Sequence, residues 1–132
     1  EVKDGKYGYV VYCGEGTPAY ELPFTVWRND TLTQAVSTVD HMLTGLVFYQ
    51  ADVAVTVGNT EISASEPCVV LMEQDAKGTK ISVTDAMMRA DLQSITLRIG
   101  EDRITIDMPQ GKECGNTVTK IYKKTYHEQT VE

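Results

Sequence analysis

Histidine and cysteine, the residues that most often build metal centres and nucleophilic sites, are scarce in this sequence. Its 132 residues include two histidines and three cysteines, Cys13, Cys68 and Cys114. No two cysteines form a C-x-x-C pair, and His41 and His127 lie far from them in the chain. This spacing argues against a zinc site, and the odd number of cysteines leaves a free thiol or an intermolecular disulfide. We predict no metal site and no cofactor.

Motifs that carry a known chemistry are also absent. The sequence has no glycine-rich phosphate loop, no G-x-S-x-G and no H-E-x-x-H. The acidic pair Glu101-Asp102 lacks the spacing of a calcium loop and is typical of a turn. Asp40 and His41 are adjacent and would point to opposite faces of a strand, so His41 is interpreted as a turn histidine. The sequence therefore predicts no catalytic and no cofactor-binding residue.

Positive charge is in short supply, with 12 Lys and Arg against 19 Asp and Glu and a net charge of −7. Nucleic acids and sulfated glycans require a cationic surface, and their binding weakens with salt. We therefore predict no nucleic-acid partner and only weak contact with acidic glycans. The candidates for that contact are Arg28, Lys120, Lys123 and Lys124. The dense basic segment 120–124 is more typical of a sheet edge guarded by lysines.

Long hydrophobic runs are missing as well. No apolar segment approaches the roughly 20 residues that span a bilayer, so we predict no membrane span. The sequence shows no signal peptide and begins at Glu1, which suits a processed or excised fragment. Apolar residues make up 42% and charged residues 23%, ordinary proportions for a folded chain of this length. We predict a single domain over residues 1–132, although residues 1–14 could belong to a neighbour.

Turn signals recur about every 8 to 12 residues, and the segments between them favour strands, which predicts an all-β fold, an antiparallel β-sandwich. Gly58-Asn59, Asp75-Ala-Lys-Gly78 and Gly100-Glu101-Asp102 are the predicted turns between paired strands. The run Pro67–Met72 is apolar throughout and is typical of a buried strand. The predicted strands cover residues 7–13, 24–27, 53–57, 60–63, 67–72, 80–84, 95–99, 104–108 and 117–126.

Residues 31–50 fit two structures. Asn29 or Asp30 could cap a helix, and several apolar residues recur at helical spacing. The Thr and Val content, the interruption at Gly45 and the strand-like end Leu46–Tyr49 favour strands instead. Periodicity alone leaves helix and strand open.

The predicted core combines apolar residues from several of these segments. Cys68 lies in an apolar run and is interpreted as a small core residue. Tyr7 and Tyr9 would share one strand face and Tyr12 the other, which favours packing over a platform for sugar rings. The residues predicted to be buried in the core are Trp27, Phe48, Val70, Met72, Ile81, Val83, Leu97 and Ile106.

Six segments match a family pattern in the right order. They are Tyr7-Gly-Tyr-Val-Val-Tyr12 with Gly14, Val26-Trp-Arg-Asn-Asp30 with Thr33-Gln-Ala-Val36, Thr44-Gly-Leu-Val-Phe-Tyr49, Ser65-Glu-Pro-Cys-Val-Val-Leu-Met72, Lys80-Ile-Ser-Val-Thr-Asp85, and Gly111-Lys-Glu-Cys-Gly-Asn-Thr-Val118. Cys13 and Ala86 stand where the pattern has proline. No single segment is specific. Together they resemble the C-terminal region of the polysaccharide lyases that include chondroitinases, hyaluronate lyases and xanthan lyases.

This resemblance implies that residues 31–50 form a β-hairpin around Asp40-His41. It implies a parent enzyme that cleaves uronic-acid-containing glycans such as chondroitin sulfate by β-elimination. In the family, the Asn, Tyr, His and Arg of that reaction lie mainly on a helical toroid domain N-terminal to this region. No position here matches their motif, so the chain alone is expected to be inactive.

The resemblance further implies a non-catalytic C-terminal domain that packs on the central β-domain of its own parent chain. Residues 1–14 would then be the last strand of that central domain. The polysaccharide substrate would be reached through the parent, in a secreted or periplasmic location. A carbohydrate-binding module and a cell-surface adhesion sandwich are the alternative functions.

Overall fold

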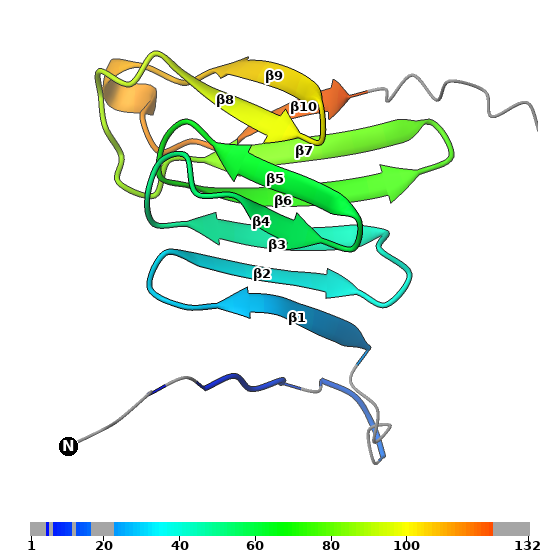
Figure 1. Ribbon diagram of the computed structural model, residues 1–132. Helices are drawn as coiled ribbons and strands as arrows, with labels where there is room; N and C mark the ends of the chain where they lie inside the picture. Colours follow the sequence, from blue (N-terminus) through cyan, green and yellow to red (C-terminus); the bar gives the residue numbers. More distant parts are fainter. Residues whose placement is uncertain (1–4, 6, 12, 17–22, 123–132) are drawn as a thin grey trace, which may run out of the picture.

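The computed structural model describes residues 5, 7–11, 13–16 and 23–122. Two antiparallel sheets pack face to face, and one 3-10 turn, η1 (Gly111–Glu113), is the only helical element among these residues (Figure 1). No helix in the described ranges is long and apolar enough to cross a membrane. The antiparallel β-sandwich predicted from the sequence is confirmed.

The larger sheet has six strands in the order β1-β2-β3-β6-β7-β10, with β1 and β10 at its edges (Figure 1). Their bounds are β1 Phe24–Asn29, β2 Thr33–Thr38, β3 Leu43–Phe48, β6 Cys68–Asp75, β7 Gly78–Thr84 and β10 Val118–Tyr122.

The smaller sheet has four strands in the order β4-β5-β8-β9. Gly58 between β4 and β5 has a φ of 60°, and Gly100 between β8 and β9 has a φ of 62°. Glycine adopts this left-handed backbone at little cost, which is why predicted hairpin turns form at these two positions. The bounds are β4 Val55–Val57, β5 Thr60–Ala64, β8 Ser94–Ile99 and β9 Asp102–Asp107.

Residues 31–50 form the β2–β3 hairpin that the family resemblance implied. Ala35 pairs with Leu46 across the two strands, and both face the core. The Asp40 carboxylate fixes the turn by accepting hydrogen bonds from the Thr38 hydroxyl (2.6 Å) and the Met42 N–H (3.0 Å). Apolar residues lie on both faces of this hairpin, and their combined spacing imitates the helical period.

The core lies between the sheets. Seven of the eight predicted core residues are 5% exposed or less, and the exception is Trp27. Trp27 is only half-buried, because it lies on the edge strand β1, although its ring still packs against the core. Its indole Nε1 donates a hydrogen bond to Ser37 Oγ (2.8 Å), and its ring contacts His41 edge to face with centroids 5.6 Å apart. The prediction that Trp27 is buried is therefore wrong, because its side chain is only partly buried.

β6 also differs from the prediction of a buried apolar strand. Its side chains alternate: Cys68, Val70 and Met72 face the core, whereas Val69 is 38% and Leu71 39% exposed on the opposite face. The alternation follows from the pleat, which points successive side chains to opposite faces of a sheet. Because Val69 and Leu71 point outward, the outer face of the larger sheet is apolar at β6.

The strand predicted for residues 7–13 is not formed by the residues that the structure describes there. The segment runs past β1 without joining its ladder (Figure 1). The Asn29 side-chain amide donates to the Tyr7 carbonyl at 3.4 Å. A strand needs a paired neighbour for its backbone groups, and Tyr12 of the predicted strand lies outside the described residues. At the other end β10 stops at Tyr122, and the predicted extension over 123–126 lies outside them too.

Candidate docking surface

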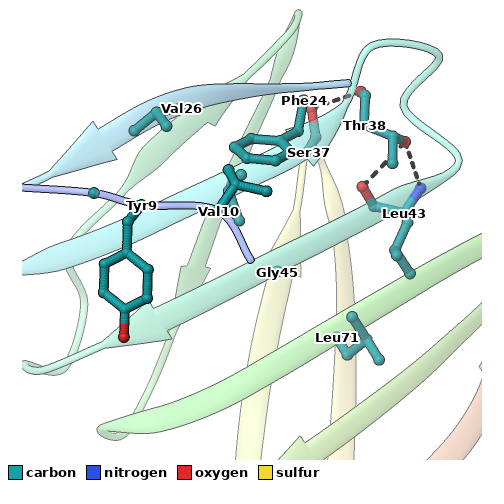
Figure 2. A pocket seen from close by; sticks show the side chains of 11 residues that line it. Tyr9, Val10, Phe24, Val26, Ser37, Thr38, Leu43, Gly45 and Leu71 are labelled. Atoms are coloured by element: carbon teal, nitrogen blue, oxygen red, sulfur yellow. Dashed lines mark hydrogen bonds between the residues drawn. The ribbon is translucent and has the colours of Figure 1, made fainter. Parts of the chain in front are cut away.

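The outer face of the larger sheet carries an apolar groove of about 850 Å³. Its floor is made by outward side chains of four neighbouring strands, β1, β2, β3 and β6 (Figure 2). Alternation along each strand puts most of these side chains on the face opposite the core, whereas Ser37 is 2% exposed and lies on the core side of β2. The strand residues that line the groove are Phe24, Val26, Val36, Ser37, Thr38, Leu43, Gly45 and Leu71.

The polar atoms near the groove are already engaged. The Thr38 hydroxyl donates to Asp40. It also accepts the Leu43 N–H at 3.1 Å (Figure 2). The Ser37 hydroxyl accepts the indole N–H of Trp27 at 2.8 Å. The groove therefore presents mainly hydrocarbon, and a partner would bind there by burying apolar surface.

The segment that precedes the sandwich forms the remaining wall of the groove. Gly8, Tyr9 and Val10 line it, and Figure 2 shows Tyr9 and Val10 beside the outer face of the strands. Tyr7 and Tyr9 lie on one side of this segment, with ring planes 4° apart and centroids separated by 6.4 Å. The chain therefore enters the sandwich along its apolar face.

The predicted glycan contacts are not brought together by the described part of the chain. Arg28 lies on β1 and Lys120 on β10, which are opposite edges of the larger sheet. Arg28 Nε contacts Asp30 Oδ2 at 2.5 Å and Nη1 donates to the Ala54 carbonyl at 3.0 Å. Lys120 Nζ donates to the Thr105 carbonyl at 3.2 Å. Lys123 and Lys124 lie outside the described residues, and glycan contact stays a prediction.

Asp30 organises the turn between β1 and β2. Its Oδ1 accepts the N–H groups of Leu32 (2.8 Å) and Thr33 (2.9 Å), while Oδ2 faces Arg28. The hydrogen bond from Arg28, followed by those from the two backbone N–H groups, lowers the pKa of Asp30 to about 2. The Arg28 guanidinium is thus already paired within its own strand and turn.

A partly exposed ionic cluster around the buried carboxylate of Asp85, which the sequence did not reveal, lies elsewhere in the sandwich. Arg89 donates to both carboxylate oxygens of Asp85, to Glu66 Oε2 at 2.8 Å and to the Pro67 carbonyl at 3.2 Å. Burial raises the pKa of Asp85, but the hydrogen bonds from Arg89 and Met87 outweigh it, so the net shift is downward. The sequence offered one signal for this cluster, the opposite charges of Asp85 and Arg89 four residues apart. It offered none for Glu66, which lies 23 residues before Arg89.

The described cysteines and His41 lie in surroundings that are typical of structural residues. Within the described ranges no three His, Cys, Asp or Glu side chains are grouped to hold a metal ion. Cys13, Cys68 and Cys114 form no disulfide. Burial raises the pKa of the Cys68 thiol to about 12, as suits the predicted core residue. His41 lies in the β2–β3 turn with a φ of 60°, in agreement with its interpretation as a turn histidine.

The fold and the order of its strands define an antiparallel β-sandwich of two sheets. Residues 25–92 match the sequence model of the C-terminal β-sandwich domain of polysaccharide lyase family 8. This match spans more than half of the chain and covers β2 to β7 and nearly all of β1, so the chain belongs to that family. The family resemblance drawn from the six segments is thereby confirmed.

A solved structure supports the same conclusion. It is that of a chondroitinase AC lyase, studied as enzyme–oligosaccharide complexes, and it matches with a TM-score of 0.65 and 27% sequence identity over 74% of this chain. The present chain spans only 15% of the length of that enzyme chain. No curated protein sequence matches significantly.

Proposed function

We propose that this chain is the non-catalytic C-terminal domain of a larger glycosaminoglycan lyase and docks on the preceding central β-domain of the same protein. The observation that carries the proposal is the apolar groove, which combines outward side chains of β1, β2, β3 and β6 with Tyr9 and Val10. Tyr9 and Val10 belong to the segment that precedes the sandwich in the chain, and they lie against this face. A contiguous apolar surface of this kind is typical of a protein–protein contact.

The proposed substrate of the parent is a uronic-acid-containing glycan such as chondroitin sulfate, cleaved by β-elimination. Support comes from the likeness to a chondroitinase AC lyase over 74% of this chain. The ionic groups of the sandwich fit a supporting function, because Arg28 is paired with Asp30 and Arg89 with Asp85 and Glu66. The domain would stabilise the parent, and the parent would contact the polysaccharide.

A secreted or periplasmic location belongs to the same proposal. Its polymeric substrate is too large to diffuse through a membrane, so the parent enzyme must meet it outside the cytoplasm. Cell fractionation followed by detection with an antibody raised against this chain tests the location. Recovery of the parent in the cytoplasmic fraction alone would contradict it.

The test of the non-catalytic role uses the chemistry of β-elimination, which leaves an unsaturated uronic acid that absorbs ultraviolet light. The purified chain is incubated with chondroitin sulfate and with hyaluronan, beside a chondroitinase AC lyase as a positive control. We expect no growth of absorbance with the chain alone. Steady growth that scales with the concentration of the chain would overturn the proposal.

Docking at the groove is tested by comparing the effect of Leu71→Ser on thermal stability in the isolated chain and in the parent protein. Leu71 is on the groove and half-exposed in the isolated chain, so the substitution should change its thermal stability little. In the parent the same change removes buried hydrocarbon at the interface and should lower the unfolding temperature more. The matched control is Thr56→Ser, on the outward face of β4 in the other sheet. Equal effects of Leu71→Ser in both proteins would exclude docking at this groove.

A further inference from the structure

A second opening, of about 80 Å³, lies between the two sheets at one end of the sandwich. The β2–β3, β4–β5, β6–β7 and β8–β9 turns gather at this end, as the pairings Leu43↔Glu73, Val57↔Thr60 and Ile99↔Asp102 show. Its floor is apolar and includes Ile62 and Met72. The opening is on the inner side of the larger sheet, away from the apolar groove.

Two threonines that are largely buried line this pocket, and their hydroxyl groups keep some exposure to it. Thr44 on β3 and Thr79 on β7 flank β6, where they pair with Met72 and Gln74 respectively. Each threonine is 7% exposed and faces the pocket, yet neither hydroxyl has a hydrogen-bond partner among the described residues. Each hydroxyl therefore has free capacity to donate and accept a hydrogen bond towards the pocket, where a ligand could engage it.

Further hydrogen-bonding groups surround the same space. The Gln74 amide and the Thr60 hydroxyl line it and are also unpaired among the described residues. The Tyr122 phenol lies at its rim, where its Oη donates to the Asp102 carboxylate. Together they offer amide and hydroxyl groups that both donate and accept hydrogen bonds.

His41 completes the lining, and Gly58 makes room for it. A Cβ at Gly58 would lie 2.8 Å from His41 Cε1, so any larger residue there would displace the imidazole. The ring is held on its other side by the edge-to-face contact with Trp27. The imidazole therefore has a fixed place in the pocket wall.

We propose that this pocket binds the end of a neutral sugar, through hydrogen bonds from its hydroxyl groups to Thr44, Thr79 and Gln74. The chemistry of the wall selects this ligand: it offers hydroxyl, amide and imidazole groups above an apolar floor that suits C–H groups. None of the described lining residues is Lys or Arg, and the Asp102 carboxylate at the rim disfavours a uronate or a sulfate. The inference is independent of the proposed docking and lyase function.

The size of the pocket limits how much of a glycan enters. Sites for drug-sized ligands measure about 300–1,000 Å³, so an oligosaccharide would not fit inside 80 Å³. One terminal residue would insert its hydroxyl-bearing edge, and the rest would extend into solvent at the turns. Affinity for a single sugar is therefore expected in the millimolar range.

The test is an NMR titration of the isotopically labelled 132-residue chain with D-galactose, N-acetylglucosamine and D-glucuronate. We expect localised shifts at Thr44, Gln74 and Thr79 with a neutral sugar, and a weaker response to glucuronate. Thr44→Val and Thr79→Val keep the side-chain shape and remove the hydroxyl, so each should weaken the affinity at least about fivefold. Thr56→Val, on the outward face of β4, is the matched control and should change nothing.

Thermal unfolding of the same variants separates lost binding from lost structure. Thr79→Val removes an unpartnered hydroxyl, so the free variant should unfold at the same temperature as the parent chain or higher. The inference would be overturned if saturating sugar caused no localised shifts, because the pocket would then hold only water. Shifts that survive both Thr→Val changes, or tighter binding of glucuronate, would overturn it as well. None of these results bears on whether the chain cleaves chondroitin sulfate.

Discussion

Arg89 holds the carboxylate of Asp85 with two parallel hydrogen bonds, Nε to Oδ2 and Nη2 to Oδ1, each 3.2 Å long. Asp85 is 2% exposed, and the same guanidinium reaches Glu66 and the carbonyl of Pro67. Glu66 lies in the connection from β5 to β6, and Asp85 in the connection from β7 to β8. One arginine therefore joins two of the segments by which the chain passes between the sheets.

We predict that Arg89→Met destabilises the chain by about 3–5 kcal/mol, because it leaves the buried Asp85 carboxylate without its countercharge. Urea unfolding followed by circular dichroism measures the loss. Lys80→Met is the matched control, since it breaks the exposed pair between Lys80 and Glu73 and should cost at most about 1 kcal/mol. A loss for Arg89→Met no larger than that of the control would contradict the structural importance of the cluster.

Val70 and Val69 are neighbours on β6 with opposite surroundings. Val70 is 1% exposed, so Val70→Asp buries an unpaired charge and should cost at least about 4 kcal/mol or prevent folding. Val69→Asp places the same charge on the outer face and should cost far less. Chemical denaturation of both variants measures the difference, and equal losses would show that the register of β6 is wrong.

Acid should weaken the β1–β2 turn through Asp30. The pKa of this carboxyl is about 2 in the folded chain and about 3.9 in an unfolded one. Its stabilising contribution is therefore complete above about pH 4 and is lost as the pH falls through 2. The difference in unfolding temperature between the parent chain and Asp30→Asn should shrink over this range. A difference that stays constant with pH would show that the Asp30 contacts do not persist in solution.

Binding of chondroitin sulfate oligosaccharides to the isolated chain should be weak and sensitive to salt. The net charge is −7, and the described candidate contacts, Arg28 and Lys120, already have protein partners. Because each released counterion steepens the salt dependence, affinity should largely disappear by physiological salt. Calorimetry at two salt concentrations measures it, with Arg28→Gln and Lys120→Gln as variants. Micromolar affinity that survives high salt would favour a carbohydrate-binding function instead.

Local pattern was sufficient to predict most strands, because alternation and glycine turns act within a few residues. The hairpins around Gly58 and Gly100 are examples, and so are the core-facing apolar side chains of β8 and β9. The pattern failed where a residue's surroundings depend on distant segments. Trp27 appeared buried, but its place at a sheet edge depends on strand order. Tyr7–Val11 has strand propensity without a paired neighbour.

The candidate sites were less accessible to sequence reasoning for the same reason. The groove requires β1, β2, β3 and β6 to lie side by side, and β6 reaches β3 only after two strands in the other sheet. Thr44 and Thr79 are 35 positions apart and meet through β6. Arg89 bonds to Glu66 across 23 positions. The sequence shows the chemistry of each residue, but only the topology shows which residues are neighbours.

The order of the strands also has a consequence for how the molecule folds. The described chain builds β1–β3 in the larger sheet, β4–β5 in the smaller, β6–β7 in the larger, β8–β9 in the smaller and β10 in the larger. Neither sheet is continuous in sequence, so completing either one requires pairing between segments that are far apart in the chain. Hairpins can form quickly, but the pairings β3–β6, β5–β8 and β7–β10 close long loops, which slows folding to about milliseconds to seconds. Hydrogen exchange should therefore show both sheets opening together, as one cooperative unit.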